Sequence, residues 1–135
     1  MRVFLLLTGA ICLMVTSCKK VADKPQSKTD YIPIISANTT SYAALGEDIT
    51  SKVKMGSYSY NADVKFINFD VKKIAERNYD IRAVGFYSNI NNSISLPVVA
   101  TFDTTLLIRP TVMGQYILRF YNSLQLVQTD TVQVK

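Results

Sequence analysis

The residue types that carry most enzyme chemistry are scarce in this chain of 135 residues. The chain has no His, the commonest general base and a common metal ligand, and its two Cys cannot build a zinc site. Ser51 and Lys52 are adjacent, so on a strand their side chains point to opposite faces and cannot form a catalytic dyad. The carboxylates are scattered, with no calcium-loop spacing and no Gly-rich phosphate loop. We therefore expect no enzyme activity, no cofactor and no metal site.

One thiol, that of Cys18, stands in a sequence context with a clear chemical meaning. Arg2 precedes an apolar run over residues 3–15, which is the layout of a secretory signal and is too short for a comfortable transmembrane helix. The run ends in Val15-Thr16-Ser17-Cys18, which resembles the lipobox of bacterial lipoprotein precursors. The resemblance implies that the Cys18 thiol receives a diacylglyceryl group, that residues 1–17 are removed, and that the new amino group is acylated, for example with palmitate.

Two or three acyl chains are enough to hold a protein stably on a membrane. We therefore expect a lipid-anchored protein of the bacterial cell envelope, in the outer membrane, with the leaflet left open. An uncleaved signal anchor, which Lys19 and Lys20 would support, and cleavage without lipid are the alternatives. Loss of Arg2 leaves 14 basic and 10 acidic residues, and because the chain is exported and its basic residues are scattered, we expect no nucleic-acid partner.

The mature chain divides into a tether and a folded domain. Residues 18–30 comprise the Cys and a polar stretch containing Pro25, which is typical of a flexible tether, so the domain is expected over residues 31–135. Seven segments of that domain alternate between apolar and polar residues and are separated by Gly or Asn turns: 31–36, 48–55, 64–69, 79–87, 98–108, 116–121 and 125–134. This spacing predicts an all-β antiparallel sandwich, although residues 71–77 also fit one helical turn.

The C-terminal half carries a second resemblance. Gly114-Gln115-Tyr116-Ile117-Leu118 is similar to the start of strand F in immunoglobulin-like domains. The resemblance implies an immunoglobulin-like sandwich in which Tyr116 is a buried corner tyrosine, bonded through its hydroxyl to the backbone of residues 110–114. Leu118 stands where antibody domains keep their second Cys, so we expect a disulfide-free version of the fold, as in bacterial surface lipoproteins. An ordinary turn followed by a strand is the alternative.

Two connections are rich in Tyr, Ser and Asn, the residues that loop-based recognition surfaces favour. They supply candidate ligand-binding side chains, namely Tyr58, Tyr60, Asn89, Asn91 and Asn92. In the expected strand order the tether joins the domain at the same end as these loops, and residues 76–78 and 110–114 form the opposite end. The sequence thus favours a non-catalytic structural or protein-interaction module with an envelope protein as partner. A glycan-binding module that uses these loops is the alternative, and a role for Tyr58 and Tyr60 in capping the core is equally open.

Two Asp-Thr tripeptides, residues 103–105 and 130–132, resemble the acceptor site for O-glycans in some bacteria that glycosylate exported proteins. The resemblance implies Thr104 and Thr131 as acceptors. The competing explanation is that Thr is simply a favoured strand residue.

Overall fold

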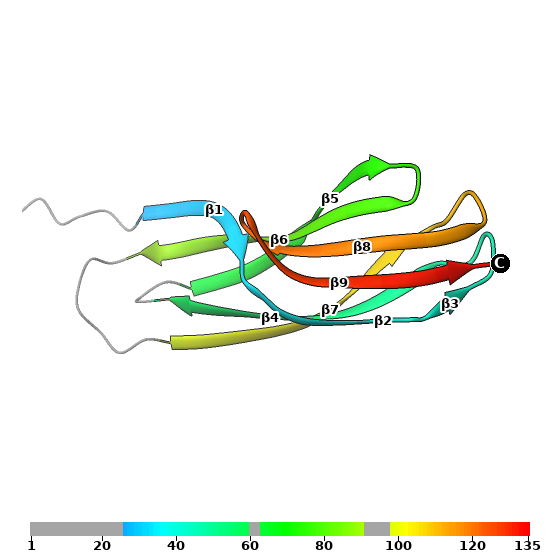
Figure 1. The fold of residues 1–135 in the computed structure, drawn as a ribbon. Coiled ribbons are helices and arrows are strands. Elements are labelled where there is room, and N and C mark those ends of the chain that lie inside the picture. Colours follow the sequence, from blue (N-terminus) through cyan, green and yellow to red (C-terminus); the bar gives the residue numbers. More distant parts are fainter. Residues whose placement is uncertain (1–25, 60–62, 91–97) are drawn as a thin grey trace, which may run out of the picture.

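The computed structural model describes residues 26–59, 63–90 and 98–135, and this part of the chain is all-β with no helix. It therefore contains no helix that could span a membrane. The nine strands form two sheets packed face to face (Figure 1), which confirms the predicted sandwich. The strands are β1 (Gln26–Ile32), β2 (Ile34–Thr39), β3 (Tyr42–Ala43), β4 (Ile49–Ser59), β5 (Asp63–Ala75), β6 (Asn78–Ile90), β7 (Val98–Ile108), β8 (Gly114–Asn122) and β9 (Gln125–Val134).

Strand β6 organises the larger sheet. It pairs with β5 along one edge, and along the other edge it pairs first with β8 and then with β1. Strands β9 and β3 continue the sheet beyond β8, and the smaller sheet has the order β2-β4-β7. The β6–β8 and β3–β9 pairings are parallel and all others are antiparallel. A period-two pattern predicts which face of a strand is buried but not which strands become neighbours, so these pairings were not visible in the sequence.

The first strands depart from the prediction in two ways. Residues 31–36 are not one strand, because Pro33 lacks an N–H and separates β1, in the larger sheet, from β2, in the smaller one. The Pro33 carbonyl instead accepts a hydrogen bond of 2.9 Å from the Gly56 N–H. The sheet also begins at Gln26, inside the expected tether, because residues 26–30 pair with β6. Residues 71–75 continue β5 and do not form a helical turn.

The predicted tyrosine corner is confirmed. Tyr116 in β8 is fully buried, and its hydroxyl donates a hydrogen bond of 3.0 Å to the Val112 carbonyl. The same oxygen accepts longer bonds from the N–H groups of Thr111 (3.3 Å) and Val112 (3.4 Å). One phenol therefore holds the whole connection between β7 and β8 against the core.

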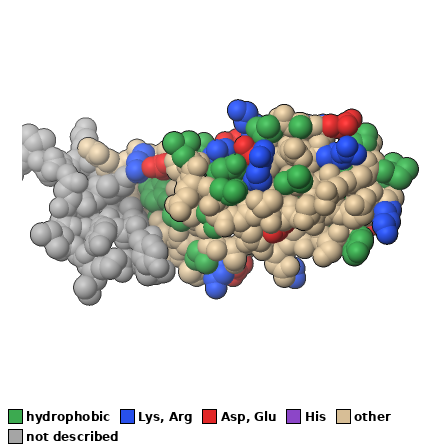
Figure 2. Space-filling view, in the orientation of Figure 1, with side chains coloured by type: hydrophobic (Ala, Val, Ile, Leu, Met, Phe, Trp, Pro, Cys, Tyr) green, Lys and Arg blue, Asp and Glu red, His purple; other side chains and the backbone are tan. Residues whose placement is uncertain are grey.

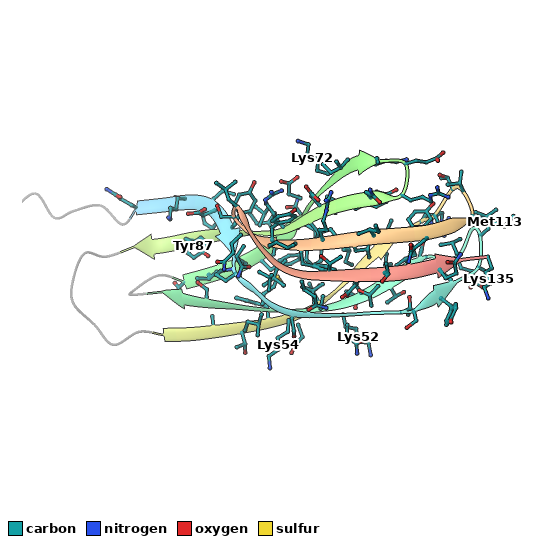
Figure 3. The ribbon with its side chains drawn as sticks, viewed as in Figure 1. Lys52, Lys54, Lys72, Tyr87, Met113 and Lys135 are labelled. Carbon is teal, nitrogen blue, oxygen red and sulfur yellow. The ribbon has the colours of Figure 1, made fainter. Side chains whose placement is uncertain are left out.

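The sandwich is elongated, and its two ends differ (Figure 1). We call the half where β1 enters the entry half, and the other, which holds β3 and most of β8 and β9, the distal half. The β5–β6 turn and the β7–β8 connection meet at the distal end, where the Arg77 guanidinium donates a bond of 2.9 Å to the Met113 carbonyl. Figure 3 shows Met113 and Lys135 at this end and Tyr87 in the entry half. The predicted position of residues 76–78 and 110–114, opposite the chain entry, is thus confirmed.

Candidate interaction surface

The outer face of the larger sheet carries an arginine between two tyrosine rings. Arg82 alternates with the buried residues Ile81 and Ala83 of β6, so its side chain points outward. Because β1 and β8 follow one another along the same edge of β6, they place Tyr31 and Tyr121 on either side of it. The guanidinium carbon lies 5.9 Å from the Tyr31 ring centre and 4.9 Å from the Tyr121 ring centre, within cation–π range.

Hydrogen bonds fix this cluster at both ends. The Arg82 Nε donates a bond of 2.6 Å to the Ser123 carbonyl in the β8–β9 turn. The Tyr31 hydroxyl donates a bond of 3.3 Å to the Asp70 carboxylate on β5. The described residues form three ion pairs within 4.0 Å, and none of them involves Arg82. Arg82 therefore has no ion-pair partner in this part of the chain, although Asp70 stands opposite it in the β5–β6 ladder.

Exposed apolar side chains adjoin the arginine. Leu124, at the tip of the β8–β9 turn, is 89% exposed, and Leu126, which pairs with Tyr121 across the hairpin, is 48% exposed. Figure 2 shows hydrophobic side chains interleaved with charged ones on the visible face of the molecule. We call the arginine, the two tyrosines beside it and the two exposed leucines the Arg82 surface; its residues are Tyr31, Arg82, Tyr121, Leu124 and Leu126.

A shallow hollow of about 300 Å³ borders the Arg82 surface; it is lined by Thr29, Asp30, Tyr31, Asp70 and Val84. The Lys28 ammonium lies 2.7 Å from the Asp30 carboxylate, and this hydrogen bond lowers the pKa of Asp30 and raises the pKa of Lys28. Asp30 is thus already paired, and Asp70, opposite Arg82 on β5, supplies the negative charge next to this arginine, so the region presents both signs of charge to a partner.

The predicted ligand-binding residues lie at the edge of the described structure or beyond it. Tyr58 and Asn89 belong to β4 and β6 by their backbone, and nothing is described of their side chains. Tyr60, Asn91 and Asn92, like Cys18, lie outside the described residues. The backbone pairing of Gln26 with Ile90 places the entering chain beside the C-terminal end of β6. The chain thus enters at the end from which the predicted Asn-rich connection follows, as predicted.

The two candidate glycan acceptors have different surroundings. Thr104 is half-buried in β7 and pairs with the buried Val53, so it faces the other sheet. Thr131 is exposed on β9, and its neighbour Asp130 accepts a bond of 2.6 Å from the Thr39 hydroxyl. Thr131 is therefore the more accessible of the two acceptors, and glycosylation of either residue remains a prediction.

The Arg82 surface was not predicted. The alternation around Arg82 shows that it points outward, but Tyr31, Tyr121 and Leu126 reach it only through the pairing of β1 and β8 with β6 and of β8 with β9. Within the described residues there is no group of three or more Asp, Glu or Cys side chains that would hold a metal ion. No protein-family model, no curated protein and no solved structure matches the chain.

Proposed function

We propose that the chain is a membrane-anchored lipoprotein of the bacterial cell envelope, and that its sandwich is a non-catalytic module that binds another protein. The observation that carries the binding role is the Arg82 surface, where an arginine without an ion-pair partner lies between two tyrosines and beside the 89% exposed Leu124. Tyr and Arg are the residues on which protein interfaces most often depend, and a contiguous exposed apolar patch suggests an interaction site.

The position of this surface suits a partner in the same envelope. Tyr31 belongs to β1, the strand that the chain enters directly after the segment expected to carry the lipid. An anchored protein would hold the Arg82 surface close to the membrane, within reach of another membrane-attached protein. Glycan binding is the weaker alternative here because Arg82 occupies one side of both tyrosine rings and limits stacking on a sugar.

The anchoring half of the proposal is tested at Cys18. Cys18→Ala is expected to accumulate as full-length precursor and to incorporate no fatty-acid label, because the thiol is the acceptor. Wild-type protein should be released from membranes by detergent but not by high salt, since acyl attachment is hydrophobic. Normal processing of Cys18→Ala would contradict the lipoprotein assignment.

The binding half is tested by photo-crosslinking in the native envelope. A photoreactive residue at Leu124 is expected to capture one discrete protein, and Arg82→Ala should abolish that product. Leu45 provides the matched control, because it is also exposed (45%) but belongs to the β3–β4 connection at the distal end. Equal capture from both positions, or capture that persists in Arg82→Ala, would contradict the proposal. Binding of the purified protein on a glycan array would favour the alternative.

A further inference from the structure

Several strands have a neighbour on one side only, and the two longest of them are β5 in the larger sheet and β7 in the smaller one. The edge of β5 carries three lysines, Lys65, Lys72 and Lys73, and its pairing with β6 is irregular at two places. Lysines and bulges are the usual devices by which proteins prevent an exposed edge from pairing with another chain. Strand β5 is therefore protected.

Strand β7 has none of these devices. Its pairing with β4 is regular from Ile49 opposite Ile108 to Ser59 opposite Val98, without a bulge. Its sequence contains no Lys and no Pro, and Asp103 is its one charged residue. A long, flat and nearly uncharged edge is the kind that readily accepts another strand.

The pairing of β4 on its other side shows which backbone groups of β7 are free. Thr50 and Gly56 direct their carbonyl and N–H toward Thr40 and Pro33, so the even-numbered residues of β4 face β2. The odd-numbered residues of β4 therefore face β7, and they pair with the even-numbered residues of β7. It follows that the N–H and C=O groups of the odd-numbered residues point away from β4; these are Val99, Thr101, Asp103, Thr105 and Leu107.

We infer that β7 is a dimerisation edge, on which the β7 strand of a second copy of this chain pairs antiparallel about a two-fold axis at Thr104. This register pairs four of these five residues, namely Thr101, Asp103, Thr105 and Leu107, with those of the other chain. Asp103 exchanges two hydrogen bonds with Thr105 of the partner subunit, and Thr101 exchanges two with Leu107 of the partner subunit. The two three-stranded sheets become one continuous six-stranded sheet.

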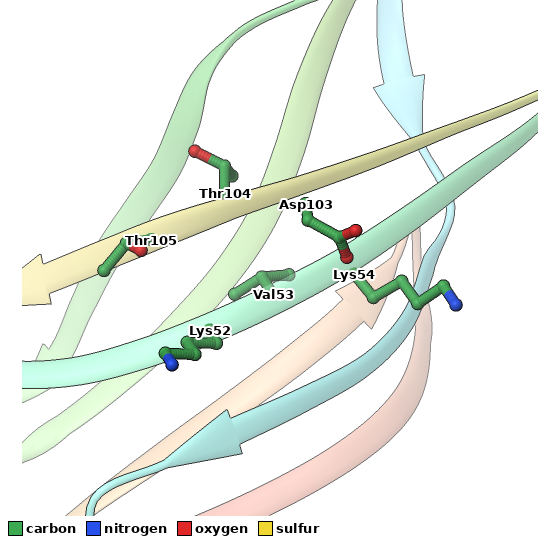
Figure 4. A pocket seen from close by; sticks show the side chains of 6 residues that line it. All are labelled: Lys52, Val53, Lys54, Asp103, Thr104 and Thr105. Atoms are coloured by element: carbon green, nitrogen blue, oxygen red, sulfur yellow. The ribbon is translucent and has the colours of Figure 1, made fainter.

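Charge favours this register. On the outer face Lys54 lies opposite Asp103 and Lys52 opposite Thr105 in the β4–β7 ladder (Figure 4). Across the dimer a row therefore runs Lys54, Asp103, then Thr105 and Lys52 of the partner subunit, with no like charges adjacent. A shift that sets Asp103 against Asp103 of the partner subunit is unfavourable, because like charges directly opposite one another destabilise a sheet. The dimer leaves the Arg82 surface free, since that surface belongs to the other sheet.

Disulfide trapping in the native membrane tests this register with the full chain. Two Thr104 residues form a non-hydrogen-bonded pair in the dimer, with Cα atoms about 4.5 Å apart, so Thr104→Cys should give a covalent dimer under mild oxidation. Lys73→Cys on the β5 edge and Thr101→Cys, which lies away from the two-fold axis, should give no more dimer than the parent chain with its own cysteines. Dimer from Lys73→Cys, or none from Thr104→Cys, would overturn the inference.

A second variant tests the free edge itself. Thr105→Pro removes an N–H that points away from β4, so the fold should be retained while dimerisation is lost. The full-length parent in detergent is expected to show twice the monomer mass after correction for detergent, and Thr105→Pro the monomer mass. A monomeric parent, or a folded Thr105→Pro that stays dimeric, would show that β7 is not the interface.

Discussion

Interior side chains are buried more completely in the distal half of the sandwich than in the entry half. In the distal half both sheets contribute fully buried side chains, among them Leu118 from β8 and Ile49 from β4. Ile32 and Met55 are still fully buried where the entry half begins, but beyond them Val64, Phe66 and Phe102, which also pack against the core, are only partly buried. Strands β8 and β9 end midway along the molecule (Figure 1), so the larger sheet is narrower in the entry half.

The two halves therefore differ in role as well as in packing. The fully buried core extends from the tyrosine corner to the boundary where β8 stops and β1 begins, and the Arg82 surface lies at that boundary. A boundary of this kind brings side chains from several strands together and leaves the turn at Leu124 without cover. The more loosely packed half is also the half nearest to the expected lipid anchor.

The sharpest test of this comparison removes one interior side chain from each half. Leu118→Ala is expected to lower the free energy of unfolding by about 2–5 kcal/mol, because a fully buried leucine leaves a cavity. Phe66→Ala should cost less although it removes a larger side chain, because Phe66 is only half-buried and packs edge-on against Phe69. Urea unfolding measures both values, and a larger loss for Phe66→Ala would reverse the comparison.

Two tyrosine hydroxyls give a second matched pair. Tyr116→Phe should cost about 1–3 kcal/mol, because it leaves the part-buried backbone groups of Thr111 and Val112 without their partner, the hydroxyl of a fully buried tyrosine. Tyr87→Phe in the entry half should cost less, because the Tyr87 hydroxyl donates one bond of 3.1 Å to the Tyr31 carbonyl in an exposed setting and accepts only a long bond of 3.5 Å from the Ser57 hydroxyl. Thermal unfolding of both variants decides this, and equal midpoints for Tyr116→Phe and the parent would contradict the role of the corner.

Local patterns in the sequence predicted the parts of the fold that depend on neighbouring residues. Alternation located most of the strands, and the Gly-Gln-Tyr segment correctly predicted that Tyr116 is buried and bonded to the connection before it. Pro33 was visible as an edge signal, but its effect, the transfer of the chain from one sheet to the other, depends on partners far away in the sequence. The extension of β1 into polar residues 26–30 was hidden for the same reason: its stability comes from pairing with β6.

The candidate site shows the same limit more strongly. Composition directed attention to the Tyr- and Asn-rich loops, whereas the Arg82 surface combines ordinary strand residues whose neighbours are set by strand order. Nothing in the local sequence distinguishes Arg82 from Arg119, which instead forms an ion pair with Asp80 at 2.8 Å.

The attachment of β1 is the entry-half feature most open to a single substitution. A Cβ at Gly85 would lie 2.5 Å from two carbons of Ile32, which is fully buried and has little room to move. Gly85→Ala should cost about 1–2 kcal/mol, because overpacking outweighs the gain from replacing a strand glycine. Hydrogen exchange of Gly85→Ala should show that the β1 amides lose protection relative to the parent chain, whereas the β8 amides keep theirs.

Gly56 supplies the control for that substitution. A Cβ there would meet mainly the end of the Ile35 side chain, which is 53% exposed and free to move aside. Gly56→Ala should therefore leave the exchange of β1 unchanged. If both alanines loosen β1 equally, close packing of Ile32 on β6 is not what holds it.

The smallest expected effect concerns the exposed ion pair at the start of β1. The bond from Lys28 and a second bond of 2.8 Å from the Tyr31 N–H lower the pKa of Asp30 below its ordinary value of 3.8. A lowered carboxyl pKa contributes stability that is present above pH 3.8 and is lost as the pH falls through the folded-state value. The raised pKa of Lys28 contributes stability that is present below pH 10.5 and is lost above it, so the pair has no effect on the pH dependence near neutrality.

Carboxyl NMR should place the Asp30 titration midpoint below 3.8 in the parent, and Lys28→Gln should raise it without reaching 3.8, because the Tyr31 N–H bond remains. An unchanged midpoint in Lys28→Gln would show that the ion pair does not hold β1 in solution, which would leave the contacts of Tyr31 and the packing of Ile32 on Gly85 to attach this strand.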